Sequence, residues 1–162
     1  ANDYNSPVRI VDTVVEVNAA RKKAMADKVI QAMGGDVKGK TIGVLGLAFK
    51  QNTDDMRDAP SLDIIPALQA AGATIRAFDP EAMEEAAHLL SDIEFAKNAY
   101  DAVQDADAMV IVTEWDQFRA LDLDRIKDAL NSNIVVDLRN IYSPEDMAGR
   151  GFQYTSIGRP TI

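Results

Sequence analysis

The sequence alternates short apolar runs with longer segments of helical periodicity, and this alternation constrains the fold more than any other feature. The apolar runs predict strands at 41–46, 74–78, 93–95, 108–112, 134–137 and 151–154. The segments between them predict helices at 61–71, 80–90, 98–104 and 123–130. Strands that alternate with helices pair in parallel through right-handed crossovers. We therefore predict an α/β fold, with a mostly parallel sheet and helices on both faces.

One long helix is predicted ahead of the first strand. Ser6 and Pro7 form a favourable start, because Ser caps a helix and Pro suits its first position. Apolar residues then recur at three- and four-residue steps until Gly34 ends the pattern. At about 27 residues, this helix is more than twice the mean length of about 12 residues. The length favours an interdomain or dimer-forming helix over the alternative, a solvent-exposed connector.

Composition excludes several classes of protein. The 162 residues carry a net charge of −9, which argues against a surface for nucleic acid or for an anionic membrane. No apolar run reaches the roughly 18 residues of a membrane span. The absence of cysteine excludes disulfides, thiolate nucleophiles and Cys-built zinc sites, and is compatible with a cytosolic location. The lone histidine, His88, argues against a His-built metal site or a serine triad, and we expect it on a helix surface.

The loop after the first predicted strand, residues 46–61, is the most informative connection. Crossover loops usually have about two to six residues, and longer ones tend to be functional. Lys50 and Arg57 could meet a diphosphate, Arg as a bidentate fork and Lys as a point charge. Gly43 and Gly46 would let the backbone come close to such a ligand. The alternative is that the arginine pairs with a nearby aspartate and the lysine is solvated.

This strand and loop are Rossmann-like, but the dinucleotide fingerprint is degraded. Of the three glycines in Gly-x-Gly-x-x-Gly only the middle one, Gly46, is retained, and Phe49 stands in place of the third. Asp79, at the end of the second strand, imitates the acid that binds a ribose. An aspartate directly before Pro80 is more typical of a turn or a cap. The pattern alone therefore does not predict that this domain binds NAD.

Two further strand ends offer candidate residues. Residues 113–119 include Trp115, for which we favour a packing role over stacking on a base. Residues 137–142 include Arg139. Ligands of open parallel sheets bind beyond the carboxyl ends of the strands. Arg139 and the two cations of the first loop therefore predict a rim for an anionic ligand, with ordinary surface cations as the alternative.

The loops, taken in order and spacing, resemble a known family. The segments that carry the resemblance are GLAFK at 46–50, NTDDMRDAPS at 52–61, TEWDQF at 113–118 and DLRN at 137–140. They are similar to the carboxyl-terminal, UDP-binding part of bacterial members of the UDP-glucose/GDP-mannose dehydrogenase family, on its UDP-glucose branch. The likeness covers essentially the whole chain.

The resemblance implies both a reaction and a set of site residues. The family's reaction would be the NAD-dependent oxidation of UDP-glucose to UDP-glucuronate, through a thiohemiacetal and a thioester on a cysteine. Phe49 and Lys50 would contact the UDP-sugar, and Arg139 would reach the UDP. Arg57 would reach across to NAD bound on another domain.

The resemblance also divides the chain. Residues 1–35 would be the end of the family's central dimerisation helix, and residues 36–162 the UDP-sugar-binding domain. Because the chain has no cysteine, no fingerprint domain and no initiator methionine before Ala1, we expect a fragment of a cytoplasmic homodimeric enzyme. Such a fragment would hold no catalytic residue and no metal, and would be inactive alone. A dehydrogenase of GDP-mannose or of a UDP-N-acetylhexosamine, and a non-enzymatic dimerising scaffold, are the alternatives.

Overall fold

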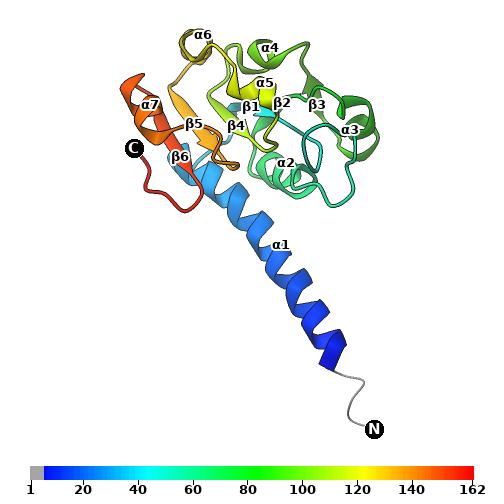
Figure 1. Cartoon of the computed structure of the whole chain (residues 1–162). Coiled ribbons are helices and arrows are strands. Elements are labelled where there is room, and N and C mark those ends of the chain that lie inside the picture. The colour runs from blue at the N-terminus through cyan, green and yellow to red at the C-terminus, as the bar shows by residue number, and fades with distance from the viewer. Residues whose placement is uncertain (1–5) are drawn as a thin grey trace.

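A six-stranded parallel sheet forms the centre of the molecule (Figure 1). The computed structural model describes residues 6–162, so expectations for residues 1–5 lie outside it. The strands are β1 (Thr41–Leu45), β2 (Thr74–Phe78), β3 (Ile93–Phe95), β4 (Ala108–Ile111), β5 (Ile134–Asp137) and β6 (Gln153–Ser156). All neighbours pair in parallel, in the order β3-β2-β1-β4-β5-β6. The predicted α/β fold is confirmed.

Helices cover both faces of the sheet and create two hydrophobic cores. The last turns of α1 (Ser6–Ala32) lie on one face with α2 (Ser61–Ala70) and α3 (Met83–Leu89). The other face carries α4 (Ala99–Val103), α5 (Asp116–Arg119), α6 (Leu123–Ala129) and α7 (Pro144–Gly149). Successive strand residues point to opposite faces, so Val44 packs into the first core and Leu45 into the second. No helix in residues 6–162 is long and apolar enough to cross a membrane.

The start of α3 differs from the sequence-based expectation. We predicted a helix from residue 80, whereas α3 begins at Met83. The cause is the Asp79 carboxylate, whose Oδ1 accepts hydrogen bonds from the N–H groups of Glu81 and Ala82, both at 2.9 Å. This turn precedes the helix and delays its first residue.

The carboxyl-terminal part of the chain shows two further differences. α5 and α7 were not predicted, although α7 carries a start signal: Ser143 Oγ accepts from the Asp146 N–H, and Pro144 follows in the first turn. The last strand lies at 153–156, two residues later than predicted. The shift arises because Gly151, with φ of 83°, belongs to the turn that ends α7.

The helix α1 has two halves with different surroundings. Figure 1 shows its amino-terminal half projecting away from the sheet domain. Its last turns are packed, with Ala26 and Val29 buried in the first core. The predicted end is confirmed: α1 ends at Ala32, and Gly34, two residues later, takes φ of 94°, which is not helical. The helix is therefore anchored at one end only.

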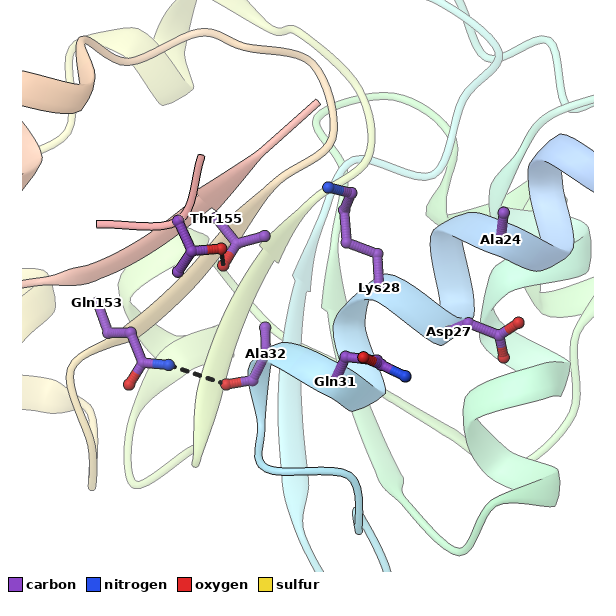
Figure 2. A pocket seen from close by; sticks show the side chains of 8 residues that line it. Ala24, Asp27, Lys28, Gln31, Ala32, Gln153 and Thr155 are labelled. Atoms are coloured by element: carbon purple, nitrogen blue, oxygen red, sulfur yellow. Dashed lines mark hydrogen bonds between the residues drawn. The ribbon is translucent and has the colours of Figure 1, made fainter. Parts of the chain in front are cut away.

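Polar contacts fix the anchored end of α1 to the sheet (Figure 2). The Lys28 ammonium donates to the carbonyl oxygen of Ser156 at 3.0 Å, and the Gln153 amide donates to that of Ala32 at 3.2 Å. A hollow of about 490 Å³ remains between the helix and β6. These contacts set the direction in which α1 leaves the domain.

The outer edge of β6 is covered by the chain itself. The N–H of Tyr154 donates to the carbonyl of Ile162 at 2.8 Å, and the N–H of Ile162 donates to that of Tyr154 at 3.1 Å. This reciprocal pair is antiparallel, in contrast to the parallel pairing of β6 with β5.

Candidate functional site

The loops that follow β1, β4 and β5 meet at the carboxyl edge of the sheet, because these strands are neighbours. The Thr113 hydroxyl, after β4, donates to the carbonyl of Ala48, after β1, at 2.7 Å. Gly46 makes this approach feasible: its φ is 94°, and a Cβ there would lie 2.5 Å from the Thr113 Cβ. The first two loops are thus in direct contact.

Gly43 of β1 and Gly46, which follows the strand, therefore serve packing within the protein. A Cβ on Gly43 would lie 2.7 Å from the carbonyl oxygen of Ala102, so α4 crosses the strand at that point. Gly46 admits Thr113 in the same way. The interpretation that these glycines let the backbone approach a ligand was wrong, because both spaces are filled by the protein.

Asp79 is a fully buried carboxylate that ties three strand ends together. Its Oδ2 accepts from the N–H groups of Leu47 and Ala48 at 2.7 and 3.0 Å, and from the Trp115 indole N–H at 3.2 Å. The preferred turn or cap role of Asp79 and the packing role of Trp115, which is 6% exposed, are both confirmed.

The same contacts decide whether this turn fits a dinucleotide. In a Rossmann fingerprint, the backbone N–H groups that follow the first strand face the pyrophosphate. Here the N–H groups of Leu47 and Ala48 already donate to the Asp79 carboxylate. A second anion at the turn would compete with a buried carboxylate for the same donors, so the turn does not fit the pyrophosphate of NAD.

Asp137 holds the loop after β5 in a similar way. This buried carboxylate accepts from the N–H of Arg139 at 3.0 Å, from that of Ile141 at 2.8 Å and from the Tyr154 hydroxyl at 2.6 Å. Burial, together with the bond to Asp137, raises the pKa of Tyr154 above its usual range. From the sequence, Asp137 is only the last residue of a predicted strand. Its role is to fix the backbone that presents Arg139.

Arg139 forms an ion pair with Glu114 across the ends of β4 and β5. Its Nε lies 2.5 Å from a carboxylate oxygen of Glu114, and the two side chains are 35% and 24% exposed. Although burial alone would raise the pKa of Glu114, the neighbouring Arg139 and Arg119 guanidiniums bring it below its usual range. Glu114 was not among the residues predicted for the site. The one available signal was its place in the loop that follows a predicted strand.

Phe49 and Lys50 lie at the start of the loop after β1. The N–H of Phe49 donates to the carbonyl of Asp55 at 2.8 Å and closes the loop at its base. The Phe49 ring is 47% exposed, which is unusual for a large apolar side chain. Lys50 is exposed, and its ammonium makes no hydrogen bond or ion pair with the part of the chain that the structure describes.

Arg57 lies apart from Arg139. It forms a bidentate pair with Asp55, at 3.0 and 2.8 Å, and its side chain is 89% exposed. This pair lowers the pKa of Asp55 to about 2. Arg57 lines a hollow of about 650 Å³ with Glu85 and Leu89 of α3, on the β2 side of the loop. Of the three predicted rim cations, Arg57 thus lies toward β2, whereas Arg139 lies in the loop after β5.

Other titratable groups form no second centre in the described part of the chain. Within residues 6–162, no group of three or more His, Asp or Glu side chains is arranged to hold a metal ion. His88 is exposed on α3, as predicted.

Comparison with known proteins identifies the family. Residues 43–144, more than half of the chain, match the family model described as "UDP-glucose/GDP-mannose dehydrogenase family, UDP binding domain". The chain belongs to this family. The UDP-glucose/GDP-mannose dehydrogenases thus share with it the strands and loops described above, from β1 to the start of α7.

Curated relatives agree with this assignment. UDP-glucose 6-dehydrogenase of Rhizobium meliloti (strain 1021) is 53% identical over 160 residues, which are 99% of this chain and 37% of that protein. UDP-glucose 6-dehydrogenase TuaD of Bacillus subtilis (strain 168) is 43% identical over 163 residues, which are 100% of this chain and 35% of that protein. The chain therefore spans little more than a third of the length of these oxidoreductases.

Solved structures of the family have the same fold. A UDP-glucose dehydrogenase from Pyrobaculum islandicum superposes with a TM-score of 0.72 at 29% identity, covering 91% of this chain and 32% of that one. An NDP-N-acetyl-D-galactosaminuronic acid dehydrogenase from Methanosarcina mazei Go1 also has a TM-score of 0.72, at 27% identity, covering 87% and 29%. The fold is thus common to relatives named for different sugars.

Proposed function

We propose that this chain is the UDP-binding domain of an NAD-dependent UDP-glucose 6-dehydrogenase, which oxidises UDP-glucose to UDP-glucuronate. The observation that carries the proposal is the Arg139 guanidinium at the carboxyl edge, which is paired with Glu114 through Nε and makes no hydrogen bond through its terminal nitrogens within residues 6–162. An arginine with two free donors suits a diphosphate, because it can bind two oxygens at once.

Three residues would share the nucleotide sugar in this proposal. Arg139 would bind the diphosphate, and Lys50 would add a point charge toward the polar end of the substrate. The exposed Phe49 ring would be covered by the ligand, which offsets the cost of its exposure to water. Phe49 and Lys50 lie in the loop after β1 and Arg139 in the loop after β5, and only β4 lies between these two strands.

The cofactor would be bound mainly outside this chain. The turn after β1 is filled by Asp79, so NAD would be held by another domain, with Arg57 reaching it from the β2 side. A thiohemiacetal requires a cysteine, and this sequence has none. We therefore propose that the chain alone is inactive. Mixing it with UDP-glucose and NAD should produce no NADH absorbance, and measurable turnover would contradict this.

Calorimetric titration with UDP-glucose tests the binding role. We expect weak but saturable binding, and a loss of about tenfold or more for Arg139→Ala, because charge-assisted bonds contribute about 1.5–3 kcal/mol. The matched control is Arg125→Ala, which removes an exposed arginine of α6 and should leave the affinity unchanged.

Three results would count against the proposal. Absence of binding at millimolar UDP-glucose would exclude a binding site formed by this chain alone. Unchanged affinity in Arg139→Ala would exclude a role of Arg139 in binding the diphosphate. Tighter binding of GDP-mannose or of a UDP-N-acetylhexosamine would favour a dehydrogenase of another nucleotide sugar.

We also propose that the projecting half of α1 forms a homodimer. Five large apolar side chains gather on one side of this half at helical spacing and are exposed, namely Ile10, Val11, Val14, Val15 and Val17. Asp12 and Glu16 lie before the middle of the helix, and Arg21 and Lys23 lie after it. The neighbouring Lys22 is already paired with Asp63 of α2, at 2.9 Å. An antiparallel second copy would cover the apolar side and place acids near bases.

Light scattering tests the dimer with paired variants. Val14→Lys should shift the chain to monomer, because it places a charge in the apolar contact. Ala20→Lys lies on the opposite side of the helix and should leave the dimer intact. A monomeric wild-type chain would contradict the dimer. A dimer that shows no response to any nucleotide sugar would favour the scaffold alternative.

A further inference from the structure

The Arg139 side chain is fixed at one end of its guanidinium only. Glu114 meets Nε at 2.5 Å, and the backbone N–H of Arg139 donates to Asp137. The contact with Glu114 is a close ion pair, since Glu114 Oε2 is buried without a hydrogen-bond partner in the part of the chain that the structure describes. Within the same residues, the two terminal nitrogens of Arg139 make no hydrogen bond. The residue is thus oriented by its protein contacts and retains two donors for a ligand.

Glu114 is well placed to act as a fixed support. Three-quarters of its side chain is buried, and the preceding residue, Thr113, is bound to Ala48 of the first loop. The other nearby guanidinium is committed elsewhere, because Arg119 donates to the carbonyl of Ile141 at 3.3 Å and lies 3.9 Å from Asp116. Glu114 therefore connects the loop of Phe49 and Lys50 with Arg139.

We infer that Glu114 is a positioning residue for nucleotide-sugar binding, which holds Arg139 through Nε so that the terminal nitrogens are left to a diphosphate. The inference rests on the proposed function. Charge alone predicts that Glu114 weakens ligand binding, because a carboxylate repels a nearby diphosphate. A positioning role predicts the opposite, that Glu114 strengthens binding. If Glu114 acted only through its charge, its neutral variant would bind the ligand more tightly. If it acts by orienting Arg139, the neutral variant will bind more weakly.

A double-mutant cycle on UDP-glucose affinity separates these cases. We expect Glu114→Gln to weaken binding about fivefold and Arg139→Ala about twentyfold, and the double variant to match Arg139→Ala alone, since coupled residues are not additive. Asp116→Asn is the matched control, an exposed acid two residues away, and should change nothing. Tighter binding by Glu114→Gln, or an equal loss in both backgrounds, would overturn the inference.

A second measurement does not depend on ligand. In the free chain, the Arg139 Nε–H should give a slowly exchanging NMR signal, which Glu114→Gln removes while the melting temperature changes little. Rapid exchange in the wild type would overturn the inference even if UDP-glucose binds. A protected signal without any UDP-glucose binding would contradict the proposed function and leave Glu114 supported as the residue that holds Arg139.

Discussion

Two layers of charged residues at the carboxyl edge of the sheet differ in how their hydrogen-bonding capacity is used. The inner layer consists of the buried carboxylates Asp79 and Asp137, whose oxygens are all engaged by loop N–H, indole or hydroxyl groups. The outer layer consists of Lys50, Arg57 and Arg139, which retain free donors or exposed surface. A saturated buried group fixes structure, whereas a charged group with spare donors can bind a ligand. The layers should therefore respond differently to mutation.

Removal of an inner carboxylate should have the largest effect. Asp79→Ala leaves four backbone N–H groups and one indole N–H without their acceptor, so we expect the free energy of unfolding to fall by about 4 kcal/mol. Urea denaturation measures this. Asp128→Asn, at an exposed acid of α6, is the control and should stay within about 0.5 kcal/mol of the wild type. A loss as small as the control's would show that the inner layer is dispensable.

Loss of one donor to the inner layer should have a smaller effect, and one that depends on pH. Tyr154→Phe removes the hydroxyl bound to Asp137 and should cost about 1 kcal/mol at neutral pH. Because the folded pKa of Tyr154 is raised, its contribution is complete below the ordinary value of 10 and is lost as pH rises above it. Urea denaturation from neutral to alkaline pH should show a shallower decline in Tyr154→Phe. Equal slopes would contradict the role of this tyrosine.

Removal of an outer cation should have the smallest effect on stability. Arg57 and Asp55 form an exposed pair, and exposed pairs contribute little to folding. Arg57→Ala should therefore leave the melting temperature nearly unchanged, while the pKa of Asp55 returns from about 2 toward 3.8. An NMR titration of the Asp55 carboxyl resonance measures the shift. A large fall in melting temperature would assign Arg57 to the inner layer.

The fold was accessible from the sequence because its signals are local. Alternating apolar runs and helical segments predicted all six strands and the parallel pairing, and Gly34 marked the end of α1. The start of α3 was misplaced because the periodicity of the sequence does not show the Asp79 carboxylate capturing the two N–H groups ahead of the helix. The four-residue helix α5 has too few residues to produce a periodic pattern. The helix α7 was missed although Ser143 and Pro144 mark its start.

The candidate site was only partly accessible. Lys50, Arg57 and Arg139 could be found because each follows a strand, where ligands of parallel sheets bind. The pairing of Arg57 with a nearby aspartate was also predicted, as the alternative, and the structure shows it with Asp55. The partner of Arg139 could not be predicted from the sequence. Glu114 meets Arg139 only because β4 and β5 are neighbours, and the separation of Arg57 from Arg139 follows from the strand order. Spatial order is a long-range property that the local pattern does not encode.

The reciprocal bonds between Ile162 and Tyr154 have a consequence for self-association. An uncovered outer strand offers free backbone groups to any other chain and favours edge-to-edge aggregation. At Tyr154 those groups are satisfied internally, and the opposite outer strand, β3, is only three residues long and carries the charged Glu94. Addition of a strand from another chain is thereby disfavoured at both edges of the sheet. Contacts between copies are left to side chains, which can select a partner where backbone hydrogen bonds cannot.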